Sequence, residues 1–311
     1  MVDICSNRLI KAVCEVGVWL DSSDVPIYSC RHSKRVFTQH QLLQGLVVKT
    51  LYRLRYRELT ELLQVSDTLV DSIGYRRIPH YTTFQKFAAR FPCRILHHLI
   101  ASIAKYLCEG TLNIALDSTG FSLCSASYHY IKRSDRKESH KDFVKASLAV
   151  DTRTQCVAAV KVRCKRRHDL FDAKPTLRKA RQTGKIMTVV ADRGYDSESL
   201  MQFIKKELGA KPVIRLKWGE TPVERTNGAI RKQLRQHFPT QAYHQRNLVE
   251  TANSTIKRRF DSVVRAKKYH TQRLDTLLKI LTHNLTIKVV EILKGFLQSQ
   301  SISTNLSISS K

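Results

Sequence analysis

Apolar residues in the first third of the chain recur at the spacing of amphipathic helices. The clearest case is residues 39–54, whose apolar positions on one face are Leu42, Leu43, Leu46, Val47 and Leu51. Thr38 comes directly before this segment, and its hydroxyl suits a helix N-cap. Residues 56–73 show the same spacing over one or two shorter helices. We therefore expect an all-α N-terminal part.

A turn and one more amphipathic helix follow in residues 74–91. Gly74 and Pro79 mark the turn, and Thr82 or Thr83 is expected to cap the helix. A helix, a turn and a capped helix with basic side chains are typical of a helix-turn-helix-like element that contacts DNA. Its basic residues are Arg76, Arg77, Lys86 and Arg90. The alternative is an ordinary helical bundle with a basic rim.

From residue 112 the pattern changes to strands that alternate with helices. Residues 111–123 are apolar and β-leaning up to a polar break, which predicts a buried strand that ends at Asp117. Two apolar segments around the turn at residues 151–154 predict an antiparallel hairpin. The expected later elements are a helix at 175–183, a strand at 186–192, a helix at 197–209, a strand at 211–218, and helices at 243–257 and 273–293. This order describes a mixed α/β layer.

These patterns predict a helical domain at residues 1–110, an α/β domain at 111–297 and a flexible Ser-rich tail at 298–311. Charge follows the same division. The chain has 54 Lys and Arg against 26 Asp and Glu, a formal net charge of +28, and 39 of the basic residues against 17 acids lie in residues 112–311. Such a field recruits polyanions, which makes nucleic acid the expected partner. A ribosome-bound protein or a merely solvated basic surface is the alternative.

Other features narrow the class of protein. The eight cysteines show no CxxC spacing, so we expect reduced thiols in a cytosolic protein rather than a zinc module. No apolar stretch approaches 18 uncharged residues, so we expect no membrane span, and the first residues do not resemble a signal peptide.

Two aspartates stand where ligands bind in α/β sheets. Asp117 and Asp192 each come at the carboxyl end of a predicted buried strand, followed by a turn that contains glycine. Side chains at this place point into the crevice of an open sheet. With Glu250 from a nearby helix they would make an all-oxygen site of the kind that Mg²⁺ and Mn²⁺ prefer. Either aspartate alone would more simply be a turn residue or a helix cap.

A third pattern lies in residues 243–257, which contain neither Gly nor Pro and are predicted to be helical. At about 100° per residue, four polar side chains fall within an arc of about 60°. They are Tyr243, Arg246, Glu250 and Lys257. The alternative is a solvated helix face in which Arg246 and Glu250 form an ion pair one turn apart.

Together these three motifs resemble those of DDE transposases. The motifs are ALDSTGF around Asp117, VADRGYDS around Asp192, and Tyr-x2-Arg-x3-Glu-x6-Lys at residues 243–257. The nearest resemblance is to prokaryotic insertion sequences of the insertion-sequence four and five groups, and it covers nearly the whole chain. Only 58 residues separate Asp192 from Glu250, too few for the large β-rich insertion that some members of the family carry there.

The resemblance implies a fold, a metal site and a DNA contact surface. It implies an RNase H-like mixed-sheet catalytic core, preceded here by the all-α, helix-turn-helix-like N-terminal domain. Asp117, Asp192 and Glu250 would be the catalytic residues and would hold two Mg²⁺ ions, for which Mn²⁺ can substitute. Tyr243, Arg246 and Lys257 would grip the DNA of the transposon end. For Arg193 a DNA contact and a pairing with a ligand carboxylate remain equal alternatives.

The expected function is therefore transposition of DNA. The protein would bind double-stranded DNA at the terminal inverted repeats of its element, cleave the 3′ ends and join them to target DNA, as a homodimer in the DNA complex. It would work at the nucleoid in a prokaryotic cytoplasm. The alternatives are an RNase H-like nuclease without strand transfer, and an inactive DNA-binding protein derived from a transposase.

Overall fold

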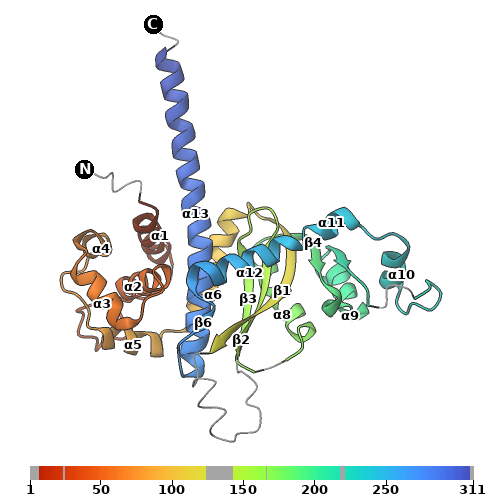
Figure 1. The fold of residues 1–311 in the computed structure, drawn as a ribbon, viewed down its shortest axis with the longest axis horizontal. Coiled ribbons are helices and arrows are strands. Elements are labelled where there is room, and N and C mark those ends of the chain that lie inside the picture. Colours follow the sequence, from red (N-terminus) through yellow and green to blue (C-terminus); the bar gives the residue numbers. More distant parts are fainter. Residues whose placement is uncertain (1–6, 24, 124–142, 166, 218–220, 309–311) are drawn as a thin grey trace, which may run out of the picture. The chain divides into compact units, whose positions relative to one another are not determined.

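The computed structural model describes residues 7–23, 25–123, 143–165, 167–217 and 221–308 (Figure 1). They form two compact units: residues 1–91 with 281–311, and residues 92–280. These limits differ from the boundaries that the sequence predicts, because the helix at Cys93–Leu107 (α6) belongs with the sheet. The Ser-rich segment also differs from the predicted flexible tail, since the last helix, α13, runs from Tyr269 to Ile308.

The described residues of the first unit form helices. Its helices, besides the end of α13, are α1 (Arg8–Asp21), α2 (Gln39–Leu51), α3 (Tyr56–Gln64), α4 (Asp67–Ile73) and α5 (Tyr81–Arg90). Thr38 caps α2 as expected: its hydroxyl accepts the N–H of Gln41, whose side chain accepts the N–H of Thr38 in return.

The cap expected for α5 is wrong. Neither Thr82 nor Thr83 caps this helix, because the chain turns helical already at Tyr81, two residues after Pro79. His80 takes the N-cap position with an extended backbone, and its Nδ1 accepts the N–H of Thr82 at 3.5 Å. The N-cap acceptor of α5 is therefore the imidazole nitrogen of His80 and not a threonine hydroxyl.

Six strands in the described part of the second unit form one mixed sheet, in the order β3-β2-β1-β4-β5, with β6 paired to the end of β1. The strands are β1 (Thr111–Leu123), β2 (Phe143–Asp151), β3 (Val157–Arg163), β4 (Lys185–Ala191), β5 (Lys211–Ile214) and β6 (Val263–Val264). The β2–β3 hairpin is antiparallel, as predicted, and β4 and β5 run parallel to β1. The predicted mixed α/β layer is confirmed.

Strand β1 does not end at Asp117. It continues to Leu123 because its antiparallel partner β2 keeps pairing with it, from Ile114 opposite Asp151 to Ser122 opposite Phe143. The polar break at Asp117 marks a different boundary, since the parallel pairing of β1 with β4 stops one residue earlier, at Leu116 opposite Ala191.

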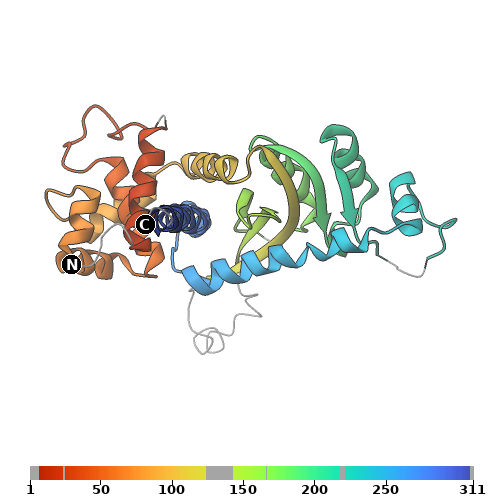
Figure 2. The ribbon, with the colours of Figure 1, turned by 90° about the horizontal axis from the view of Figure 1, so that it is seen from above.

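Helices cover the sheet and connect its strands. Besides α6, they are α8 (Leu170–Arg181), α9 (Glu198–Gln202) with a π-helical continuation at Phe203–Glu207, α10 (Ala229–Gln236), α11 (Thr240–His244) and α12 (Asn247–Phe260). The predicted single helix at residues 243–257 is therefore two, which follow one another along the sheet (Figure 2). The junction at Gln245 and Arg246 is tightened by i→i+3 hydrogen bonds such as Arg246 N–H to the Tyr243 carbonyl, 2.9 Å.

Among the described residues, no helix is both long enough and apolar enough to cross a membrane.

Candidate active site

The register of the sheet brings Asp117 and Asp192 together. Ala191 is the last residue of β4 and lies opposite Leu116 of β1, so an aspartate follows each of these two paired residues, Asp117 on β1 and Asp192 directly after β4. Neighbouring strands are about 4.8 Å apart. The two carboxylates therefore occupy adjacent strands at the level where the parallel pairing ends, which is where an α/β sheet opens a crevice.

The environment of Asp117 makes its ionised form costly. Its pKa is raised to about 6, first by burial and then by the charges of Asp192 and Glu250, against the opposing effects of the Ser118 N–H and the Arg246 guanidinium. Two other carboxyl groups thus lie within electrostatic reach of Asp117. Such a concentration of negative charge calls for a cation.

Asp192 is fixed by the turn that follows it. Its Oδ1 accepts the N–H of Gly194 at 2.9 Å and so caps the 3₁₀ turn Arg193–Tyr195. A Cβ on Gly194 would come within 3.0 Å of that same oxygen, so the close approach favours glycine. Tyr195 is buried beneath the turn, where its hydroxyl lies 3.2 Å from the Ser118 hydroxyl.

Helix α12 is attached to Asp117 by Asn253. The amide nitrogen of Asn253 donates to Asp117 Oδ2 at 2.9 Å, and the Asn253 side chain is almost fully buried. Glu250 lies three residues earlier, on the same face of the helix. The hydrogen bond from Asn253 to Asp117 therefore helps to fix the position of Glu250 relative to β1.

Glu250 itself is held by a cation. The Nη2 of Arg246 donates to Glu250 Oε1 at 2.6 Å, with Glu250 about half exposed. This is the i,i+4 pair that the sequence offered as the alternative to a functional face, and the structure shows that the pair forms. The charge of Arg246 also reaches Asp117, so the pair belongs to the acidic site.

The acids fit a divalent cation by their chemistry but are not gathered into a finished set of ligands. In the described ranges, no three His, Cys, Asp or Glu side chains are placed to hold a metal ion. Oxygen ligands suit Mg²⁺ and Mn²⁺, and the raised pKa of Asp117 shows a charge that the protein leaves partly uncompensated.

The other members of the predicted helix face make separate contacts. Tyr243 packs edge-to-face on Phe238 at 5.3 Å, and the Arg215 guanidinium lies 5.8 Å from its ring centre. Lys257 has its Nζ 5.9 Å from the ring centre of Phe121, which is four residues after Asp117 on β1. Tyr243 lies before Glu250 in the chain, on α11, and Lys257 lies after it, on α12.

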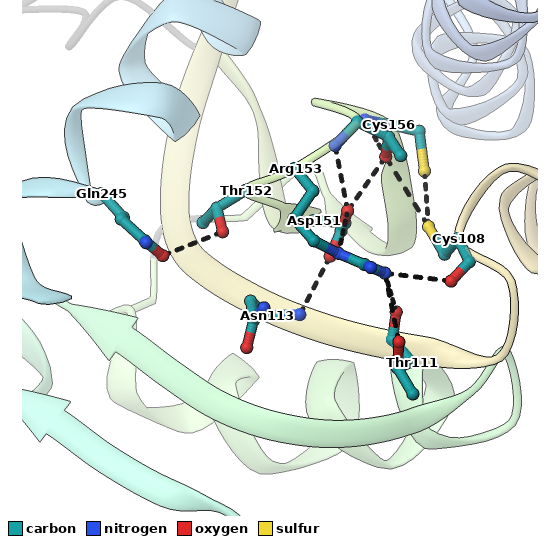
Figure 3. Close-up of polar contacts among 9 residues, drawn as sticks. Cys108, Thr111, Asn113, Asp151, Thr152, Arg153, Cys156 and Gln245 are labelled. Carbon is teal, nitrogen blue, oxygen red and sulfur yellow. Dashed lines mark hydrogen bonds and ion pairs between the residues drawn. The ribbon is translucent and has the colours of Figure 1, made fainter.

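A hydrogen bond from the β2–β3 turn reaches the junction between α11 and α12 (Figure 3). The Thr152 hydroxyl donates to Gln245 Oε1 at 3.0 Å and so ties the junction to the β2–β3 turn. That turn is held by the fully buried Asp151, which accepts the N–H of Asn113 on β1 at 2.9 Å and the N–H of Thr154 at 3.0 Å. The residue after Gln245 is Arg246, which binds Glu250.

The C-terminal end of α12 is held by a buried lysine of α13. Lys279 of α13 is 3% exposed and donates to the carbonyls of Phe260, Asp261 and Val263 at 2.8, 2.8 and 2.9 Å. An ammonium group at a helix C-terminus satisfies carbonyls that lack helical partners and complements the helix dipole. Both ends of α12 are therefore positioned by side chains from other elements.

The remaining predicted contact residues are exposed. Arg193 is exposed in the 3₁₀ turn directly after Asp192. Arg76 and Arg77 are exposed between α4 and α5, and Lys86 is exposed on α5. These last three belong to the helical unit.

Sequence reasoning missed Asn253, Gln245 and Lys279. Asn253 had a usable signal, because it lies one helical turn after Glu250. The partners of Gln245 and Lys279 are a threonine hydroxyl and backbone carbonyls, which any surface could supply, so no local pattern points to them.

Two of three comparisons with known proteins found a match. The family model described as a transposase DDE domain matches residues 110–285, more than half of the chain. Among solved structures, the chain is similar to one titled as the cryo-EM structure of a piggyBac transposase synaptic complex with hairpin DNA. The identity is 9% over 92% of this chain and 73% of that one, with a TM-score of 0.46. No curated protein matches the sequence.

Proposed function

The chain belongs to the family of transposases with a DDE domain, and we propose that it cleaves the 3′ ends of an insertion sequence and joins them to target DNA. It is thus a polynucleotidyl transferase. The observation that supports the proposal best is the position of Asp117 and Asp192 on adjacent strands, with α12 hydrogen-bonded to Asp117. The finer assignment, to the insertion-sequence four and five groups, rests on the Tyr-x2-Arg-x3-Glu-x6-Lys spacing.

In this proposal Asp117, Asp192 and Glu250 hold divalent cations, two Mg²⁺ ions or Mn²⁺ in their place. Such ions supply Lewis-acid stabilisation of the charge that develops on phosphodiester oxygens. The chain's own residues do the positioning. Asn253 orients Asp117, the Gly194 N–H orients Asp192, and Arg246 orients Glu250.

The DNA of the terminal inverted repeats would lie along the basic residues that border the acids. Tyr243 can stack on a displaced base, while Arg246, Lys257 and Arg193 can neutralise phosphates. Arg76, Arg77 and Lys86 of the helical unit would contact the repeat at a second place, as a helix-turn-helix-like element does. Cleavage of paired ends would need a homodimer on DNA, at the nucleoid of a prokaryotic cell.

The test substitutes Glu250 with its isosteric amide. Glu250→Gln should abolish 3′-end cleavage and joining on a duplex that carries the element's end, with Mg²⁺ present, while DNA binding persists. Glu224→Gln is the matched control, because Glu224 is an exposed acid of the same unit outside the cluster. Cleavage and joining by Glu250→Gln at the wild-type rate would refute the proposal.

The same assay separates the alternatives. Cleavage without joined products would favour an RNase H-like nuclease, for which water is the only nucleophile. Binding that needs no metal, with no cleavage of any end sequence, would favour an inactive DNA-binding protein derived from a transposase.

A further inference from the structure

A second polar site lies in the sheet unit, at the edge strand β3 and away from the acids. A pocket of about 230 Å³ is lined by Ala158, Ala159 and Val160 of β3 together with residues of α6 and α8. The small side chains of the two alanines leave the space open. A water molecule takes about 30 Å³ of liquid volume, so the pocket admits a phosphate-sized group with several waters.

The polar groups around this pocket are basic. Arg94, His97 and His98 come from one face of α6, Lys179 comes from α8, and the remaining polar side chain is that of Gln182. None of the described lining residues is acidic. Arg273, in the first turns of α13, adds its charge, since it lowers the pKa values of both His97 and Lys179.

Burial and neighbouring positive charges disfavour the charged forms of His97 and Lys179 in this pocket. The pKa of His97 is lowered to about 4, first by burial and then by the charges of Lys179 and Arg273. The pKa of Lys179 is lowered by burial and then by Lys161 and Arg273. Within the part of the chain that the structure describes, the buried Nε of Arg273 has no hydrogen-bond partner.

The buried carboxylate of Asp172, which lies on α8 like Lys179, is already occupied by other cations. Asp172 already pairs with Arg163 at 2.6 Å, and Lys161 and Lys145 stand 3.8 and 3.9 Å from it. The single carboxylate of Asp172 is therefore shared by Arg163, Lys161 and Lys145. In the part of the chain that the structure describes, the charges of Lys179 and Arg273 therefore remain for another anion.

We propose that the pocket between α6, β3 and α8 is a phosphate-binding site, formed by His97, Lys179 and Arg94, to whose charges Arg273 adds its own. A phosphate oxyanion accepts hydrogen bonds from each of these donors and removes the repulsion among them. In a chain of this net charge the fitting source is a backbone phosphate of DNA, held at a distance from the acidic site. The assignment of the phosphate to DNA rests on the proposed function, whereas the inference that the pocket binds phosphate does not.

His97 provides the readout, because a bound anion must raise its pKa. The pKa is measured by NMR of the histidine ring protons in the full chain, with the resonance assigned from a His97→Gln variant. Inorganic phosphate is compared with sodium chloride at equal ionic strength, and a short DNA duplex forms the second arm. We expect phosphate to raise the pKa of His97 by about one unit or more.

Two variants make the result specific. Lys179→Ala removes a donor from the pocket and should abolish most of the shift, measured from that variant's own baseline. Lys185→Ala removes an exposed lysine of the same unit that does not line the pocket, and should leave the shift intact.

The outcomes separate the site from its source. A shift with both phosphate and duplex supports the site and assigns it to DNA, and a shift with phosphate alone supports the site but assigns it to a free phosphate. No shift with either, or an equal shift in Lys179→Ala, overturns the inference. Neither result depends on cleavage or joining, so failure here is distinct from failure of the transposase assignment.

Discussion

At the scale of the residue, the most informative property of the site is the raised pKa of Asp117. The side chain is partly buried, lies within reach of the charges of two other acids, and receives hydrogen bonds from the Asn253 side chain and the Ser118 N–H. Its native pKa of about 6 lies above the value of 3.8 for an unperturbed aspartate. Between these two values the native state binds more protons than the unfolded state, so stability falls as pH rises.

The predicted measurement is the unfolding free energy of the metal-free protein against pH. Relative to Asp117→Asn, the wild type should lose stability as pH rises from about 4 to about 6, by an amount on the order of 3 kcal/mol. Above pH 6 the difference should stay constant. Urea unfolding at fixed ionic strength gives both curves, and parallel curves would mean that the pKa of Asp117 is not raised.

At the scale of the element, α12 is placed by its two ends. Gln245 ties the start to the β2–β3 turn, and Lys279 binds three carbonyls at the finish. The backbone at Asp261, just after the helix, has a φ of 74°, which a residue with a Cβ adopts only when its surroundings enforce it. The hydrogen bond from Lys279 to the Asp261 carbonyl is one such contact.

Lys279→Met should therefore destabilise the protein strongly. The variant keeps the length of the side chain but leaves buried carbonyls without their donor, which costs about 3 kcal/mol or more. Thermal or urea unfolding measures the loss. Lys267→Met is the control, because Lys267 is exposed in the loop before α13. Equal stability of the two variants would contradict the assigned role of Lys279.

At the scale of the whole molecule, the net charge of +28 should dominate DNA affinity. Each phosphate that a Lys or Arg neutralises releases counterions, so affinity falls steeply with salt. For about six such phosphates, the dissociation constant should rise roughly a thousandfold between about 50 and 200 mM salt.

Fluorescence anisotropy with a labelled duplex tests this dependence. Joint substitution of Arg76, Arg77 and Lys86 by Ala should make the slope of log K against log salt shallower, by about 0.9 for each phosphate that the variant no longer neutralises. An affinity that does not change with salt would show that the charge plays no part in binding. An unchanged slope in the triple variant would mean that Arg76, Arg77 and Lys86 do not contact the DNA.

The sequence by itself determined the elements and the chemical types. Apolar periodicity marked the helices of the first unit and the buried strands of the second, since each must bury one face. The motif spacing marked Asp117, Asp192 and Glu250, because strand ends and helix turns place side chains locally. The cap of α5, the end of β1 and the break before α12 were misjudged for the opposite reason. Each depends on a partner distant in sequence or on a side chain with several possible roles.

Only the tertiary structure decided how the acids meet and what holds them. The pairing register of β1 with β2 and β4 set Asp117 beside Asp192, and a register cannot be read from one strand alone. Asn253 and Lys279 acquired their roles from partners 136 and 16 to 19 residues away in the chain. Local sequence encodes propensity and chemistry, whereas the contacts that position a site are long-range and are selected when the whole unit packs.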